Sequence, residues 1–406
     1  MNAAPDRVVP VNAEAVSKIV ARCDRAGEKI LIAGGGTLAG MGYPPERVDV
    51  ELVTTGLTGI AANERADLVV AVRAGMPVQD IARLLAAQGQ FVPLDAPQPR
   101  YATLGGTLAA GWLGPRRHCY GRLRDYLIGS TIVLADGTIA RAGGMVVKNV
   151  AGYDMSRLYV GSFGTLGVLV QANLKTIPLP PHARLFLASL PERTRERACA
   201  QLAALRIPPA AAFWIDGFQA IDGEAGPEGR VLAILEGSAA LLERATLELR
   251  SALGRAGVPE TRVIEAGARE SFERVVDQYV ACLGERSATY RLFPPAEESV
   301  QRALDLRELA QRFGLQSEAI GDVMNGDVVL RVSDLDTLSF GAKIEAFDDA
   351  LHEAEPRAQV VASSHPHRMY LRVWGADPPA VDRMRQLKER FDPKRTLNPG
   401  RCVGGI

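Results

Sequence analysis

Three glycine-rich segments in the first half of the chain have the residue types that suit binding of a phosphate group. They are residues 34–38 (GGGTL), 103–107 (TLGGT) and 161–167 (GSFGTLG). Successive backbone N–H groups in such loops form anion-binding nests, and glycine lets the backbone come close to a ligand. A tight turn explains any one of these loops equally well. A large, doubly charged cofactor that is wrapped by several loops explains all three at once.

The first segment also matches a dinucleotide-binding fingerprint. Gly34, Gly36 and Ala39 satisfy the GxGxxA pattern. That motif requires a helix to begin within the loop, so that the pyrophosphate meets the helix N-terminus. Residues 40–45 read GMGYPP, and glycine and proline both disfavour a helix at this point. We therefore predict that no Rossmann-type NAD site is formed here.

Histidine and cysteine are the residue types that would bind a metal ion or an iron–sulfur cluster. The chain has five histidines, and only His365 and His367 lie close together, separated by Pro366. We interpret this pair as polar histidines in a loop rather than as metal ligands. The five cysteines are scattered and form no CxxC motif, which excludes a ferredoxin-like cluster within the chain.

The elements that must position the glycine segments alternate between helix and strand. A helix is predicted after Asn12, which is a suitable N-cap, and a second helix opens at Pro77. The predicted strands of this part are residues 29–33, 68–73, 127–134 and 168–174.

Prolines at 178, 180 and 181 break this pattern, and we place a domain boundary there. Beyond it, short strands separated by helices suggest two βαββαβ halves, a split ferredoxin-like arrangement. The predicted strands of this second part are residues 185–190, 212–216, 231–235, 289–293, 328–332 and 369–373.

The overall composition excludes several classes of protein. Lys+Arg and Asp+Glu both total 47, so the formal net charge is zero and gives no reason to expect nucleic acid as a partner. No apolar run approaches the roughly 20 residues that span a bilayer. The N-terminus has no signal-peptide pattern. We expect a cytoplasmic protein, with peripheral attachment to the inner membrane through partner subunits as the alternative.

An ordered series of motifs resembles the FAD-binding domain of the vanillyl-alcohol oxidase and p-cresol methylhydroxylase family. The resemblance covers about residues 10–180 and the C-terminal tail. The three glycine segments occur in the family's order, with Arg124-Asp125 and Asp136-Gly137 between the second and the third. The tail, with residues 391–393 (FDP) and 397–400 (LNPG), is similar to the family's C-terminal return to the flavin.

Within that family, one subgroup fits best. Residues 114–117 (GPRR), followed by Gly121, and residues 148–154 (KNVAGYD) resemble the FAD-binding subunit of bacterial glycolate oxidases. KNVAGYD is the most specific of these strings.

The resemblance implies roles for individual residues. The first loop would hold the FAD pyrophosphate, the second would line the pyrophosphate and ribityl region, the third would pack the adenosine half, and the tail would lie near the flavin ring. The cofactor-binding residues implied in this way are Gly34, Gly35, Gly36, Thr37, Leu38, Thr103, Gly105, Gly106, Gly114, Gly121, Gly164, Thr165, Gly167, Val168, Asn398 and Arg401. Many relatives attach FAD covalently through a histidine in the first loop. Thr37 stands there in this chain, so noncovalent FAD is expected.

The same resemblance implies a dehydrogenation that needs an anchor for the substrate carboxylate and a base for the hydroxyl proton. Arg117, with Arg116 beside it, is the candidate anchor, and His367 is the candidate base. The alternative for both arginines is a structural or phosphate-binding role. Relatives that oxidise 2-hydroxy acids bind a metal through glycine-rich histidine motifs in the second domain. Those motifs are absent here, so no metal is expected.

The expected fold is α/β with an α+β second domain. Residues 1–180 would form an FAD-binding domain of two α/β subdomains of the p-cresol methylhydroxylase type. Residues 181–390 would form a ferredoxin-like cap domain that faces the substrate, and residues 391–406 a tail that returns to the first domain.

The expected function is that of a flavoprotein oxidoreductase subunit in a heteromeric glycolate oxidase complex. It would help to oxidise glycolate, or a related 2-hydroxy acid such as D-lactate, to the 2-oxo acid. The implied partners are a homologous FAD- and metal-containing catalytic subunit and an iron–sulfur subunit, because electron transfer from the flavin needs a relay that this chain cannot build. Two alternatives remain: a stand-alone FAD-dependent 2-hydroxy-acid dehydrogenase, and a non-catalytic electron-transfer or scaffold subunit.

Overall fold

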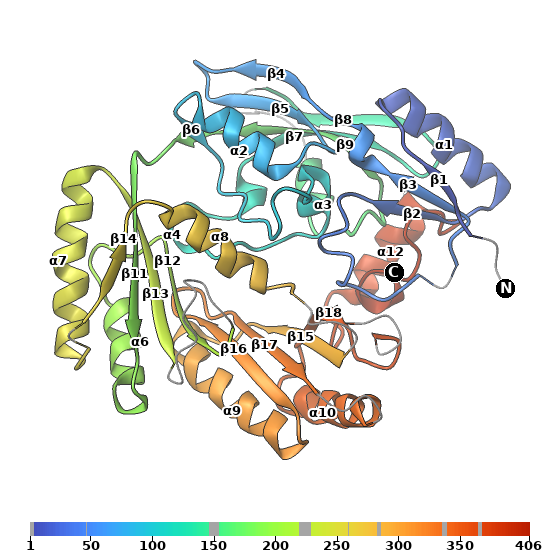
Figure 1. The fold of residues 1–406 in the computed structure, drawn as a ribbon. Coiled ribbons are helices and arrows are strands. Elements are labelled where there is room, and N and C mark those ends of the chain that lie inside the picture. The colour runs from blue at the N-terminus through green and yellow to red at the C-terminus, as the bar shows by residue number, and fades with distance from the viewer. Residues whose placement is uncertain are drawn as a thin grey trace. The chain divides into compact units, whose positions relative to one another are not determined.

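The computed structural model describes residues 4–45, 47–145, 154–218, 229–258, 260–281, 286–334, 339–363 and 368–406 (Figure 1). The chain packs as two compact units. One comprises residues 1–114, 122–179 and 377–406, and the other comprises residues 115–121 and 180–376. By packing, residues 377–390 therefore group with the first unit, which differs from the predicted limits of the second domain.

The first unit begins with a small parallel sheet of order β1-β3-β2. Its strands are β1 (Asp6–Val8), β2 (Ile30–Ala33) and β3 (Val50–Val53). Helix α1 (Ala13–Ala26) connects β1 to β2, and the side chain of Asn12 accepts a hydrogen bond from the N–H of Ala15 at 2.8 Å, which confirms the predicted cap. Apolar residues of α1 enter a core with β2 and β3.

A five-stranded antiparallel sheet completes the first unit, with strand order β4-β5-β9-β7-β8. Its strands are β4 (Ile60–Glu64), β5 (Val69–Arg73), β7 (Leu127–Val133), β8 (Ile139–Gly143) and β9 (Val168–Lys175). Helix α2 (Val78–Ala86) begins after Pro77, as predicted, and buries Val78, Ile81 and Leu85. The remaining elements of the unit are β6 (Gln90–Phe91), β10 (Ile177–Pro178), α3 (Leu104–Ala109), α5 (Met155–Leu158) and α12 (Val381–Phe391).

The second unit is built on an eight-stranded antiparallel sheet of order β14-β11-β13-β12-β16-β17-β15-β18. Its first half is β11 (His182–Ser189), α6 (Arg195–Ala203), β12 (Ala211–Asp216), β13 (Arg230–Gly237), α7 (Ala239–Arg255) and β14 (Arg262–Ile264). Its second half is β15 (Ser287–Leu292), α9 (Ser299–Arg312), β16 (Gln316–Asp322), β17 (Val328–Ser333), α10 (Phe340–Ala354) and β18 (Gln359–Ser363). Helix α8 (Ala268–Gln278) joins the halves, and α4 (Arg117–Tyr120) lies in the segment 115–121. Each half is a βαββαβ unit, which confirms the ferredoxin-like prediction.

One predicted strand of the second unit is wrong. Residues 369–373 form turns and irregular chain, and the side chains of Met369 and Tyr370 are exposed. The outer strand is β18 instead, which pairs with β15 through Val360 and Ala362. Strand β18 and residues 369–373 are both short and apolar, and pairing with β15 decides which of them becomes a strand.

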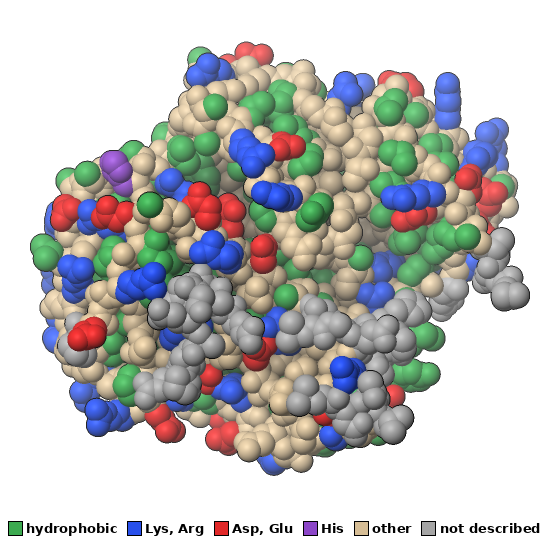
Figure 2. All heavy atoms as spheres, viewed as in Figure 1, with side chains coloured by type: hydrophobic (Ala, Val, Ile, Leu, Met, Phe, Trp, Pro, Cys, Tyr) green, Lys and Arg blue, Asp and Glu red, His purple; other side chains and the backbone are tan. Residues whose placement is uncertain are grey.

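The charged side chains are distributed without a dominant sign. Figure 2 shows Lys and Arg side chains interspersed with Asp and Glu over the described surface of one face, in agreement with the zero net charge. Within the described ranges, no helix combines the length and apolar character that crossing a membrane requires.

A buried histidine in α10 predicts a pH-dependent stability. The Nδ1 of His352 lies 2.8 Å from the backbone oxygen of Asp348 and 3.4 Å from its carboxylate, and Nε2 lies 3.2 Å from the backbone oxygen of Ala358. Burial opposes the charged ring, but the hydrogen bond and charge of Asp348 outweigh it and raise the pKa of His352 above its usual 6.5. The folded state therefore binds a proton more tightly than the unfolded state.

The stabilisation from His352 is fully present below the unfolded-state pKa and is lost as the pH rises through the folded-state pKa. We expect the free energy of unfolding to fall over this range, and His352→Gln to remove that part of the pH dependence. Urea titrations at a series of pH values measure both. An unchanged pH profile in the variant would exclude His352 as the source.

Candidate functional site

The first glycine loop packs directly on the segment that contains the second. A Cβ atom added to Gly35 would lie 1.6 Å from the backbone oxygen of Tyr101, and one added to Gly34 would lie 2.4 Å from Oγ1 of Thr103. Only glycine permits so close an approach of the two segments. The structure thus brings together two segments that are about 70 residues apart in the sequence.

The first loop also presents donors that the protein does not use. Within the part of the chain that the structure describes, the backbone N–H groups of residues 35–38 have no hydrogen-bond acceptor. Gly36 has a φ of 77°, in the left-handed region that glycine favours, and residues 37–42 form turns and a bend with no helix. This confirms that the fingerprint match does not begin a Rossmann helix. The loop is a nest of free amides that suits a diphosphate.

The second segment is the start of a helix rather than a loop, which corrects the sequence interpretation. Thr103 is the N-cap of α3, and its Oγ1 accepts from the N–H of Gly106 at 3.2 Å. The N–H of Gly105 donates to the backbone oxygen of Ala74 at 2.7 Å, and that of Leu104 donates to Met76 at 3.1 Å. These amides are therefore used within the protein, and of this segment Thr103 and Gly106 lie against Gly34 of the first loop.

The third segment docks on the same helix. The N–H of Gly161 donates to the backbone oxygen of Leu108 at 3.0 Å, and that of Phe163 donates to Ala109 at 2.8 Å. The hydroxyl of Thr165 donates to the backbone oxygen of Ser162 at 2.6 Å. All three glycine segments predicted to surround one cofactor therefore gather around α3.

Other residues of the predicted set are placed as follows. Gly167 packs against Ile132, and Val168 begins β9 in the core. Gly114 packs against Asp95, since an added Cβ would lie 2.4 Å from the Asp95 Cβ. Gly121 ends α4 with a φ of 83° and belongs to the second unit. Asn398 and Arg401 both hydrogen-bond to the backbone of residues beside the glycine loops.

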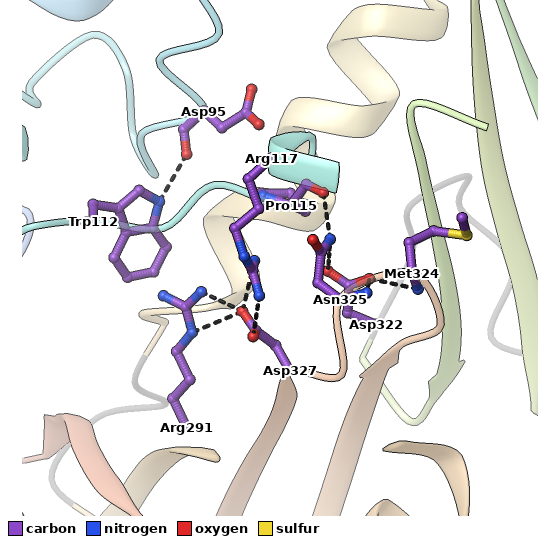
Figure 3. Close-up of polar contacts among 9 residues, drawn as sticks. All are labelled: Asp95, Trp112, Pro115, Arg117, Arg291, Asp322, Met324, Asn325 and Asp327. Atoms are coloured by element: carbon purple, nitrogen blue, oxygen red, sulfur yellow. Dashed lines mark hydrogen bonds and ion pairs between the residues drawn. The ribbon is translucent and has the colours of Figure 1, made fainter. Parts of the chain in front are cut away.

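In the second unit, the candidate anchor Arg117 is bound to a buried carboxylate (Figure 3). Its Nη2 donates to Oδ1 of Asp327 at 2.5 Å and its Nη1 donates to Oδ2 at 3.1 Å. Arg291 also donates to Oδ2 of Asp327. Burial works against the charged form of Arg117, but Asp327 outweighs it and raises the pKa of the guanidinium. A substrate carboxylate would therefore have to displace Asp327.

A neighbouring carboxylate shares this buried region of the second unit. Asp322 is fully buried and accepts from the N–H groups of Met324 and Asn325, each at 2.9 Å. The side-chain amide of Asn325 donates to Asp322 at 2.9 Å and to the backbone oxygen of Pro115 at 2.7 Å, as Figure 3 shows. Burial and the charge of Asp327 raise the pKa of Asp322 to about 7.

Arg116 forms an ion pair with a second buried carboxylate, that of Glu236. Its Nη1 lies 3.2 Å from each oxygen of Glu236, whose side chain is only 1% exposed. The hydroxyl of Tyr120 donates to Glu236 at 2.9 Å, and Arg269 donates to it at 3.2 Å. Both arginines of the segment 115–121 thus neutralise buried acidic groups of the second unit.

Two predictions fall on residues that the structure does not describe. The candidate base His367, with His365, lies outside the described residues. So do the first six residues of the KNVAGYD string, 148–153. Among the described residues, no group of three or more His, Cys, Asp or Glu side chains is placed to hold a metal ion.

The sequence interpretation missed the partners of the two arginines. Asp327 lies 210 residues beyond Arg117, and Glu236 lies 120 residues beyond Arg116. Neither carboxylate belongs to a recognisable motif. The only local signal was the occurrence of acidic residues next to a predicted strand.

Comparisons with known proteins agree with the cofactor-binding arrangement of the glycine segments in the first unit. Residues 6–154 match the model of a family described as an FAD binding domain. The chain is 27% identical to glycolate oxidase subunit GlcD of Bacillus subtilis, over 98% of this chain and 88% of that protein. It is 40% identical to glycolate oxidase subunit GlcE of Escherichia coli, over 37% of this chain and 43% of that protein. A D-lactate dehydrogenase of Archaeoglobus fulgidus is 26% identical over 98% of this chain and 90% of its own length.

Solved structures share the fold at low sequence identity. An alkyldihydroxyacetonephosphate synthase superposes with a TM-score of 0.69 and 16% identity, over 97% of this chain and 77% of the other. A 4-ethylphenol oxidase of Gulosibacter chungangensis superposes with a TM-score of 0.70 and 13% identity, over 97% and 88%. The fold is that of the p-cresol methylhydroxylase type, as predicted.

Proposed function

We propose that this chain, an FAD-binding oxidoreductase, is a subunit of a complex that oxidises glycolate, or a related 2-hydroxy acid such as D-lactate, to the 2-oxo acid. The support is twofold. The first unit brings three glycine segments together at α3, and the first of these segments has free amides at residues 35–38. Among the relatives that extend over nearly the whole chain are proteins named as a glycolate oxidase subunit and as a D-lactate dehydrogenase.

The residues of the first unit fit FAD. The amides of residues 35–38 would hold the pyrophosphate, since backbone donors in a nest compensate two negative charges without a cationic side chain. The bound flavin supplies a two-electron hydride acceptor. Thr37 offers a hydroxyl where a histidine would be needed for covalent attachment, so the cofactor would be held by noncovalent contacts alone.

The proposed partners are a homologous flavin subunit and an iron–sulfur subunit. Two of the relatives, GlcD and GlcE, are themselves named as subunits, which supports a heteromeric assembly. The described cysteines are free thiols, and three of them are buried, so they offer no obvious route for single electrons. A separate carrier that accepts electrons from the flavin is consistent with this arrangement.

A second candidate function is a flavin subunit that carries electrons and binds no substrate itself. The observation in its favour is that Arg116 and Arg117 both form ion pairs with buried carboxylates. An arginine that binds a substrate carboxylate does so through a free bidentate face. Here Asp327 already occupies that face of Arg117.

An anaerobic titration of the FAD-loaded chain with glycolate and with D-lactate tests the proposal. Bleaching of the visible flavin band by either acid would show that this subunit performs the oxidation. A flavin that is reduced only after the partner subunits are added would support the electron-carrying role within the same complex. A flavin that stays oxidised with both acids, even in the assembled complex, would overturn the proposed function.

A further inference from the structure

The C-terminal segment extends the small parallel sheet of the first unit. The N–H of Ile30 donates to the backbone oxygen of Thr396 at 2.8 Å, and the N–H of Asn398 donates to that of Ile30 at 2.9 Å. Leu397 is thereby bridged to Ile30 in parallel and is fully buried. The tail is therefore hydrogen-bonded to β2, the strand that runs into the first glycine loop.

Asn398 connects that strand to the third glycine segment. Its Oδ1 accepts from the N–H of Ile32 at 2.7 Å, and its Nδ2 donates to the backbone oxygen of Phe163 at 2.6 Å. A Cβ on Gly164 would lie 2.9 Å from the same Nδ2, so glycine is needed for this contact. One side chain thus fixes the distance between the third glycine segment and β2, the strand that runs into the first loop.

Lys388 makes a second connection to the third segment from α12. Its side chain is 2% exposed. The ammonium uses all three of its donors: to the backbone oxygen of Thr165 at 2.8 Å, to that of Leu397 at 2.9 Å, and to Oδ2 of Asp392 at 2.6 Å. Asp392 in turn accepts from the N–H groups of Thr396 and Leu397. A buried charge persists only when it is paired and fully hydrogen-bonded, so this network specifies one position of the tail.

Arg401 holds the far end of the first loop. Its guanidinium donates to the backbone oxygens of Ala39 at 3.3 Å, Met41 at 2.8 Å and Tyr43 at 3.3 Å. Residues 39–43 follow directly after the free amides of residues 35–38. Arg401 thus fixes the backbone that leaves the first loop, while the tail's hydrogen bonds to β2 fix the backbone that enters it.

We propose that residues 388–401 form a clasp that fixes the first and third glycine loops in their cofactor-binding arrangement, with Lys388, Asn398 and Arg401 as positioning residues. The clasp acts through backbone atoms of the loops. Glycine-rich loops lose much conformational freedom when they are ordered, so a loop that is already held binds its ligand more tightly. FAD affinity should therefore depend on the contacts that Lys388, Asn398 and Arg401 make within the protein.

The test compares Arg401→Gln with Lys394→Met in the full chain. Lys394 is a matched control, because its Nζ binds the tail to the backbone oxygen of Asp24 at 3.0 Å and to its carboxylate at 2.8 Å, and to no glycine loop. The two readouts are the dissociation constant of FAD, from flavin fluorescence on titrating the apo-protein, and the rate of amide hydrogen exchange in the apo-protein.

We expect Arg401→Gln to weaken FAD binding by at least about tenfold and to accelerate exchange in residues 35–43, while exchange in the second unit stays unchanged. Lys394→Met should bind FAD within about twofold of the parent chain. Lys388→Met should accelerate exchange in residues 161–167; if that variant does not fold, Arg401→Gln decides the matter alone. Parent-like affinity and exchange in Arg401→Gln would overturn the clasp, as would equal weakening in Lys394→Met.

Discussion

Replacement of Asp327 by alanine is expected to lower the free energy of unfolding of the second unit by about 3–5 kcal/mol. The carboxylate is completely buried and accepts hydrogen bonds from Arg117 and Arg291. The side chains of these arginines are 11% and 3% exposed. Removing Asp327 takes away the buried carboxylate to which both guanidinium groups donate. Urea unfolding followed by tryptophan fluorescence, to which Trp214 buried in β12 contributes, measures the change.

Two further variants separate the electrostatic part of this loss in the free energy of unfolding from the part due to packing. Adding Arg117→Met to Asp327→Ala removes one of the two cations that Asp327 binds and should recover part of the lost stability. Asp349→Ala breaks an exposed pair with Arg372, whose side chains are 64% and 55% exposed, and should cost less than about 1 kcal/mol. A loss below about 1 kcal/mol in Asp327→Ala would contradict the buried network.

Replacement of Gly35 by alanine is expected to weaken FAD binding by about 100-fold or more, since a displacement near 1 Å is enough for effects of that size at a preorganised site. The added Cβ would lie 1.6 Å from the backbone oxygen of Tyr101 and 2.5 Å from its carbonyl carbon. The obstacle is backbone, so no side-chain rotation relieves it. The loop must move away from the segment 101–103 and take its free amides with it. Equilibrium titration of the apo-protein with FAD gives the affinity.

Gly36→Ala is the matched control in the same loop. Nothing lies within 4 Å of a Cβ at Gly36, and only its φ of 77° opposes alanine. The expected cost of this backbone conformation for alanine is about 1 kcal/mol. If the whole cost opposes FAD binding, the affinity falls roughly fivefold. An equal loss in both variants would mean that the loop's conformation, and not its approach to Tyr101, limits binding.

The sequence predicted well those features that depend on neighbouring residues. Asn12 and Pro77 each mark a helix start, and both helices begin where local capping and proline geometry require. Residues 40–45 excluded a Rossmann helix because glycine and proline act within a few residues. The alternation of helices and strands after residue 180 was sufficient to predict two ferredoxin-like halves.

Features that depend on distant partners were not predictable. TLGGT has two glycines and resembles a loop, yet Thr103 caps a helix there, and Gly105 in that helix packs against Ala74 of another segment. Arg117 had the chemistry of a substrate anchor. Its actual partner, Asp327, is 210 residues away and has no motif. A single sequence carries no signal for such a pair, and therefore the role of Arg117 could be assigned only from coordinates.

The order of strands in the second unit has a consequence for self-association. The halves meet where β12 pairs with β16, and these are the second strands of the two ferredoxin-like motifs. In a separate half, each would lie at the edge of the sheet with one side unpaired, and such an edge is a template for aggregation. Joined in one polypeptide, they satisfy each other's backbone groups, as the two subunits of a symmetric dimer would. The second unit thus contains an interface between its halves like that of a dimer, and among the described residues the outermost strands, β14 and β18, are the edges of this sheet.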